Sequence, residues 1–109
     1  MTARHWRGWT KLENAGAYEA FLRQRIFPQL KRIEGYRGGY LLRQDRNAET
    51  EFIVLNFFDS IQAVQRFAGE EYARAVIEPE AKVLLARWEE TAEHFEVRMK
   101  IEVEKEAAG

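Results

Sequence analysis

The stretch EFIVLNFFDS, Glu51 to Ser60, decides how this chain folds, because it is the most apolar run in the sequence and still contains an asparagine. Its β-branched and aromatic residues predict a strand. Side chains alternate across a strand, so one set faces one way: Ile53, Leu55 and Phe57. The other set faces the opposite way: Phe52, Val54, Asn56 and Phe58. Both sets are largely apolar, which predicts that both faces of this strand are buried.

Three other segments are expected to form strands beside this one. The first runs from Arg4 to Lys11, where Gly8 indicates a bulge or a close approach to the backbone. The second runs from about Tyr36 to Arg43 and forms a hairpin with the opening stretch through a polar turn. The last, Glu93 to about Glu104, alternates apolar with charged or polar residues.

Helices are expected in the two long connections. Apolar residues at helical spacing predict one helix from about Ala15 to Ile33, which Pro28 should kink or end early. Asp59-Ser60 is a helix N-terminal signal, and the residues after it form a short apolar face. The segment from Gly69 to Trp88 is expected to form further helical turns, with a fresh start near Pro79.

The predicted order of elements is strand, helix, strand, strand, helices, strand. This is the ferredoxin-like βαββαβ arrangement of the α+β class, a four-stranded antiparallel sheet with helices on one face. The 109 residues fit a single domain, 1–109. We expect an ordered core over about residues 4–98 and a C-terminal strand extension or tail over 99–109.

The second face of the sheet has no cover within one chain, because the helices lie on the other face. Since the opening strand is apolar on both sides, a second sheet is the natural cover. We therefore expect a homodimer in which two sheets pack face to face. The far end of the last strand, near Ile101 and Val103, would reach the partner subunit; the alternative is a disordered charged tail.

Composition narrows the classes of partner. The formal net charge is -1, so the chain lacks the basic excess typical of proteins that bind nucleic acid or anionic membranes. It contains no cysteine, which removes disulfides, thiolate catalysis and cysteine-ligated metals. The N-terminal stretch lacks the apolar core of a signal peptide, and no run is long enough to span a membrane. These features predict a cytoplasmic protein.

Three segments carry a family resemblance: RGWTK (7–11), EFIVLNFFDSIQAVQRFAGEEYARAVIEPEA (51–81) and EHFEV (93–97). They resemble the antibiotic biosynthesis monooxygenase family, most recognisably at the aromatic-Asp-Ser step FFDS into a helix. The resemblance implies a dimeric α/β barrel with a cavity between helices and sheet. It also implies one possible activity, cofactor-independent oxygenation of polycyclic aromatic molecules. Relatives include quinol monooxygenases, haem-degrading monooxygenases and proteins without a demonstrated reaction.

Two residues are candidates for catalysis. A buried amide needs a hydrogen-bonding partner, so Asn56 could hold a substrate oxygen, or it could satisfy a structural contact. The family's oxygenases use an asparagine among their substrate contacts, although relatives often carry another residue at this position. His94 could take a proton from a phenol or quinol, with Glu96 on the same face to orient it, or it could be a hydrogen-bonded structural residue. His5 is expected to be exposed.

The candidate substrate-binding residues are aromatic, because a flat substrate would stack on such side chains. We select those near the strand–helix junction and the irregular helical segment: Phe58, Tyr72 and Trp88. No metal site, nucleotide loop or cofactor site has support in the sequence. Haem-degrading relatives use an axial histidine after the third strand, and this chain has none between Ser60 and Trp88. The predicted function is a cofactor-free monooxygenase of an aromatic or quinol-like molecule, with a non-catalytic ligand-binding dimer as the alternative and haem degradation as a weaker one.

Overall fold

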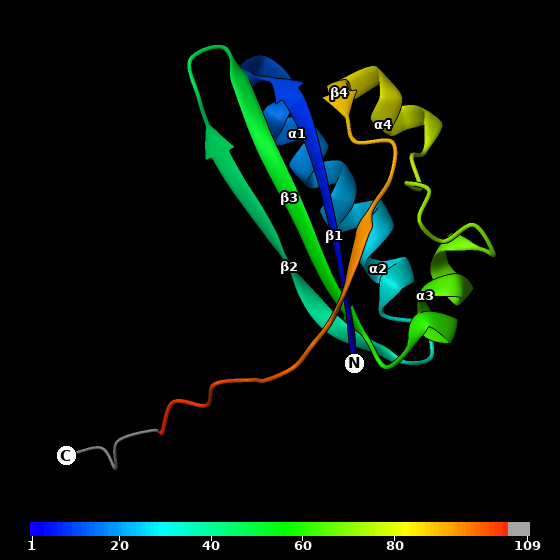
Figure 1. Ribbon diagram of the computed structural model, residues 1–109. Helices are drawn as coiled ribbons and strands as arrows, with labels where there is room; N and C mark the ends of the chain where they lie inside the picture. The colour runs from blue at the N-terminus through cyan, green and yellow to red at the C-terminus, as the bar shows by residue number, and fades with distance from the viewer. Residues whose placement is uncertain (105–109) are drawn as a thin grey trace.

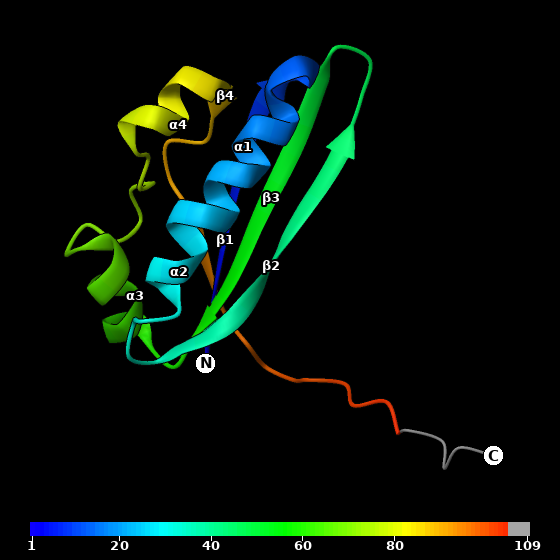
Figure 2. The same ribbon diagram turned by 180° about the vertical axis from the view of Figure 1, so that it is seen from behind.

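The computed structural model describes residues 1–104 and contains one antiparallel sheet with helices on one face (Figures 1 and 2). The central strands are β3 (Glu49–Phe58) and β1 (Thr2–Lys11), which pair along their whole length. Strand β2 (Tyr36–Asp45) forms a hairpin with β3. The far edge of β1 pairs with two short strands, β4 (Leu85–Trp88) and β5 (Glu93–Glu96). The α+β, ferredoxin-like prediction is confirmed.

The last strand differs from its prediction. Leu85–Trp88, expected to be helical, pairs with β1 instead, and Glu93–Glu96 continues along the same edge after a short interruption. The helical period there belongs only to α4 (Pro79–Leu84), which begins at the expected proline. As strands, these segments pair with the backbone N–H and C=O groups along the edge of β1. A longer helix would leave those groups without partners. The strand expected to reach Glu104 ends at Glu96, and residues 97–104 have no regular structure.

The first helical connection passes through its proline. After a 3₁₀ turn (Leu12–Asn14), α1 (Ala15–Phe21) leads into a π-helical turn (Leu22–Ile26) and then α2 (Phe27–Leu30). The backbone N–H of Phe27 bonds to the carbonyl of Leu22, five residues earlier, just before Pro28. The wider π-helical turn accommodates Pro28, which has no N–H to donate, so the helix continues past this residue. It ends at Leu30, short of the predicted Ile33.

The second connection begins with α3 (Ile61–Ala68), whose N-terminus is capped as predicted. The hydroxyl of Ser60 accepts a hydrogen bond from the backbone N–H of Ala63 at 3.2 Å. Between α3 and α4 the chain has turns and one isolated bridge rather than the expected helix. This irregular segment matters below, because part of it lines a cavity.

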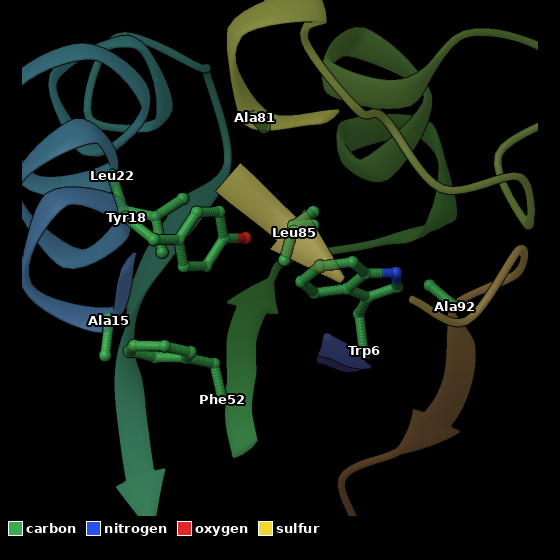
Figure 3. Packing of buried hydrophobic residues seen from close by; sticks show 8 residues of the cluster. All are labelled: Trp6, Ala15, Tyr18, Leu22, Phe52, Ala81, Leu85 and Ala92. Atoms are coloured by element: carbon green, nitrogen blue, oxygen red, sulfur yellow. The ribbon is translucent and has the colours of Figure 1, made fainter. Parts of the chain in front are cut away.

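The main core lies between the helices and one face of the sheet, and it is the even-numbered residues of β1 and β3 that face the helices (Figure 3). Phe52 is completely buried, and its ring lies edge-on to that of Tyr18, with 5.0 Å between centroids. Trp6 lies beside them and donates its indole N–H to the carbonyl of Glu89 at 2.7 Å. The odd-numbered residues of these strands lie on the open face.

The close backbone approach predicted at Gly8 is present. A Cβ atom at Gly8 would lie 2.5 Å from the six-membered ring of Trp6 and 3.2 Å from Leu85. We expect Gly8→Ala to lower the free energy of unfolding by about 1–3 kcal/mol, because the buried indole must move. Gly16→Ala is the control: its Cβ meets nothing within 4 Å. In α1 it should raise stability by about 0.5–1 kcal/mol. Urea unfolding of both variants tests this, and equal effects would contradict it.

Candidate functional site

A cavity lies between the helices and the helix-facing side of the sheet. The space in it that can hold the centre of a water molecule is about 70 Å³, and the empty volume of about 610 Å³ also includes open solvent. Its wall is apolar and comes from β1, β3, all four helices, the π-helical turn and the segment before α4. Only three lining side chains are charged or carry an amide: Arg4, Asn56 and Glu78.

A row of polar residues crosses the sheet under the helices, and two of them, Arg4 and Asn56, line the cavity. Asn56 on β3 pairs directly with Arg4 on β1, and Arg4 pairs directly with His94 on β5. On the other side, Asn56 pairs with Gly39 on β2. Directly opposed residues of an antiparallel pair point to the same face, so these side chains stand next to one another under the helices. We call Tyr36, Asn56, Arg4 and His94 the polar row.

Asn56 is 5% exposed and lines the cavity rather than the open face of the sheet. The hydroxyl of Tyr36 donates to its Oδ1 at 2.7 Å. Among the described residues no acceptor contacts its Nδ2, which can therefore donate to a bound molecule. Gly39 makes this arrangement possible, since a Cβ there would lie 2.2 Å from Oδ1 of Asn56.

Arg4 is equally buried, with 5% of its surface exposed. Its Nη1 donates to the carbonyl of Tyr72 and contacts Nε2 of His94 at 2.9 Å, and its Nη2 donates to the carbonyl of Arg74 at 3.2 Å. Its guanidinium also lies 5.7 Å from the ring centre of Phe67. No carboxylate in the described part of the chain lies within ion-pair distance. Burial lowers the pKa of Arg4 to about 10, so the group stays charged at neutral pH.

His94 does not line the cavity and contacts Arg4 instead. Arg4 can only donate, so Nε2 of His94 accepts, and the ring proton sits on Nδ1. Burial, and then the charge of Arg4, lower the pKa of His94 below its ordinary value. The imidazole is therefore neutral at pH 7, and the lone pair on its Nε2 already accepts a hydrogen bond from Arg4. Its ring lies edge-on to Tyr72, with 5.0 Å between centroids.

The three aromatic residues selected from the sequence pack near the cavity but do not line it. Phe58 is completely buried in a second core cluster, with Tyr36 and Phe67 against it. Tyr72 packs on that same cluster, and Trp88 packs on the main core. Their predicted roles in substrate binding stay predictions. The aromatic side chains in the cavity wall are Trp6, Tyr18, Phe21, Phe27 and Phe67.

Sequence reasoning missed Arg4 and Tyr36. The signal for Arg4 was present but not used: in an alternating strand Arg4 shares a face with Trp6, which places a charge on an apolar face. Tyr36 gave no comparable signal, because the strand register shifts between Tyr36 and Gly38 and only then does its hydroxyl reach Asn56.

The lining residues do not suit haem. A haem iron needs an axial ligand, usually a histidine, cysteine, methionine or tyrosine. Of these only Tyr18 lines the cavity, and burial raises the pKa of its hydroxyl far above neutral, against the phenolate form that binds iron. Within residues 1–104 no three histidine or acidic side chains gather in a way that could hold a metal ion.

No helix within residues 1–104 has the length and apolar character to cross a membrane.

Solved structures with the same fold exist at low sequence identity. One, from Deinococcus radiodurans, is named "putative antibiotic biosynthesis monooxygenase"; it superposes with a TM-score of 0.69 at 13% identity, covering 96% of this chain and all of that one. A protein of the same name from Bacillus cereus gives a TM-score of 0.63 at 12% identity, covering 94% of this chain and 97% of its own. No protein-family model and no curated protein matches the sequence. The chain therefore has the fold of these two proteins, which confirms the ferredoxin-like fold of the single chain; the dimeric barrel that the resemblance implies stays a prediction.

Proposed function

We propose that this protein is a cofactor-independent monooxygenase that oxidises an electron-rich aromatic or quinol-like molecule held in the cavity. The observation that carries the proposal is Asn56: a buried amide, fixed by Tyr36, with its Nδ2 unpaired among the described residues at the floor of an apolar cavity. A phenol or quinol has the matching features, a flat apolar ring and an oxygen that accepts a hydrogen bond.

The reaction needs only substrate and oxygen. The phenol loses its proton to solvent, and the phenolate transfers one electron to O₂. The resulting radical and superoxide combine at a ring carbon that carries hydrogen. Loss of water from this peroxide leaves a quinone, so one oxygen atom enters the ring and the other leaves as water. Asn56 stabilises the phenolate oxygen in the first step, and the apolar wall keeps water from the intermediates.

His94 takes a different part from the one predicted for it. Because its Nε2 accepts from Arg4, it does not contact the substrate as a base. In this proposal His94 positions Arg4, and Arg4 and Asn56 stand side by side at the substrate oxygen. Because Nε2 of His94 already accepts this hydrogen bond, no histidine is free to move a proton in the cavity. This favours the alternative, a non-catalytic ligand-binding protein of this fold.

Replacing Asn56 with leucine tests the proposal. Aromatic ligands are first found by a binding screen, and oxygen uptake is then measured with each. We expect Asn56→Leu to reduce the rate of uptake by about 10²–10³-fold, the effect of removing one donor to a developing oxyanion. Asn14→Leu is the control, since the side chain of Asn14 makes no capping hydrogen bond and Asn14 lies outside the cavity.

Two outcomes would contradict the oxygenase. If ligands bind to the wild-type protein without oxygen consumption, the non-catalytic alternative holds. If Asn56→Leu folds, binds the same ligands and consumes oxygen at the wild-type rate, Asn56 has no role in the reaction.

We further propose that the protein is a homodimer formed through the open face of the sheet. Within the single chain this face exposes large apolar side chains: Tyr40 is 66% exposed, Leu42 46% and Phe95 52%. Beyond β5, Met99, Ile101 and Val103 are also exposed, at 80%, 84% and 88%. Their alternation fits a strand that forms only against a partner subunit. The cavity lies on the opposite side of the sheet, so dimerisation would leave it accessible.

A further inference from the structure

The charge of Arg4 has no counter-ion within the described part of the chain, although Arg4 is 5% exposed. Several more exposed arginines are paired: Arg7 lies 3.0 Å from Glu89, and Arg87 lies 2.8 Å from Glu49. Removing a charge from water is costly unless an opposite charge compensates. Arg4 is held instead by two backbone carbonyls, the ring of His94 and the face of Phe67, none of which carries a negative charge. Glu78, the one carboxylate of the cavity wall, makes no ion pair with Arg4.

Arg4 also has hydrogen-bond donors to spare. A guanidinium carries five N–H groups, and the contacts with Tyr72, His94 and Arg74 use Nη1 and one N–H of Nη2. Its Nε and the other N–H of Nη2 have no acceptor among residues 1–104. Adjacent Nε and Nη2 atoms form the edge that binds carboxylates, as Arg87 shows by donating to Glu49 from Nε at 3.3 Å and from Nη2 at 2.8 Å.

The surroundings of Arg4 hold it in place without neutralising it. The two carbonyls belong to the segment between α3 and α4, part of which forms the cavity wall. The neutral His94 accepts from the other side, so Arg4 is fixed between the wall and β5. Asn56, its direct neighbour on β3, brings a second unpaired donor, Nδ2, to the same floor.

We propose that the cavity selects anionic ligands: a flat apolar molecule whose oxyanion, a carboxylate or a phenolate, pairs with Arg4 while its ring lies among the aromatic side chains of the wall. This inference rests on the proposed function for the location of the binding site, but not for any oxidation step. Arg4 is the residue that contacts the ligand, and His94 is a positioning residue that acts through it.

Matched ligands test the proposal on the wild-type protein. Naphthoate and naphthamide share one ring system and differ in charge, and para-nitrophenolate and para-nitroanisole make the same comparison for a phenolate. Calorimetric titration should show that each anion binds at least ~10-fold more tightly than its neutral counterpart, as a charge-assisted hydrogen bond would give. A preference in one pair alone identifies the oxyanion class. Equal affinities in both pairs, or no saturable binding of any of the four, would overturn the proposal.

The two histidines supply a second readout in the same protein. An anion beside Arg4 offsets the charge that disfavours protonation of His94, so saturating naphthoate should raise the pKa of His94. His5 lies on the same strand as Arg4 but on the open face, so it is the internal control. Proton NMR of the two imidazoles follows both. If naphthoate binds and the titration of His94 does not move, the anion lies elsewhere and the proposal fails.

Three arginine variants complete the test. Arg4→Met should abolish the preference for naphthoate over naphthamide, and Arg4→Lys should retain part of it. Arg66→Met is the control, because Arg66 is exposed and donates to the carbonyl of Glu34 outside the cavity. A preference that survives in Arg4→Met would overturn the proposal; if this variant does not fold, the wild-type measurements decide. Anion binding without oxygen uptake would refute only the oxygenase, and oxygen uptake without anion preference would refute only this inference.

Discussion

Replacing Phe52 with alanine is expected to lower the free energy of unfolding by about 3–5 kcal/mol, the cost of removing a large aromatic side chain from a packed core. Phe52 is completely buried at the helix-facing side of β3. It belongs to the main core cluster with Tyr18 and Trp6, and its ring meets that of Tyr18 edge-on (Figure 3). Tyr18 is on α1, so a cavity left at Phe52 would weaken the packing of α1 on β3, the strand between β1 and β2.

Phe57→Ala is the matched control, since Phe57 is on the same strand but faces the open side of the sheet. Urea unfolding of both variants is measured over a range of protein concentrations. The loss in Phe52→Ala should be the same at every concentration, because it arises within one chain. The loss in Phe57→Ala should be smaller and should grow where the dimer is populated. Equal losses that ignore concentration would contradict the assignment of the two faces.

The alternation in EFIVLNFFDS was sufficient to predict the two faces of β3, because the period of a strand is a local property. It could not show which face the helices cover. That choice depends on the crossover connections, and it decides the role of Asn56. The structure places Asn56 under the helices at the cavity rather than on the open face of the sheet.

The polar row could not be predicted because it depends on register between strands. Arg4, Asn56 and His94 lie far apart in sequence and become neighbours only when three strands align. His94 was selected for its chemistry alone, and its pairing with Arg4 changes what it can do. Similarly, Leu85–Trp88 was assigned to a helix on local pattern, whereas a long-range partner, the free edge of β1, makes it a strand.

Replacing Leu55 with glutamate is expected to convert the proposed dimer into a monomer. Leu55 lies in the middle of the open face, where it pairs with His5 on β1 and with Tyr40 on β2. Arg7 lies on the same face one position further along, opposite Ile53, and it is already paired with Glu89 at 3.0 Å. A carboxylate at Leu55 would lose its contact with water in the proposed interface and would gain no unpaired cation from its own strand pair.

Symmetry doubles this effect. A two-fold interface uses the same patch on both copies. Each dimer would therefore bury two carboxylates, one from each copy, against the partner's sheet. We expect the dissociation constant to rise by at least ~10³-fold, which corresponds to ~2 kcal/mol for each copy. Sedimentation velocity should then give twice the 12.8 kDa chain mass for the wild-type protein and the single-chain mass for Leu55→Glu.

Two further variants separate the sheet face from other causes of dissociation. Val83→Glu places the same new charge at a site on α4 that is 80% exposed, on the helical side of the sheet, and should leave the dimer intact. A chain that ends at Arg98 lacks the exposed apolar residues of the extension and should dimerise more weakly than the wild-type protein. An unchanged dimer in the shortened chain would leave the sheet face as the whole interface. A Leu55→Glu protein that is still dimeric would contradict the proposed interface.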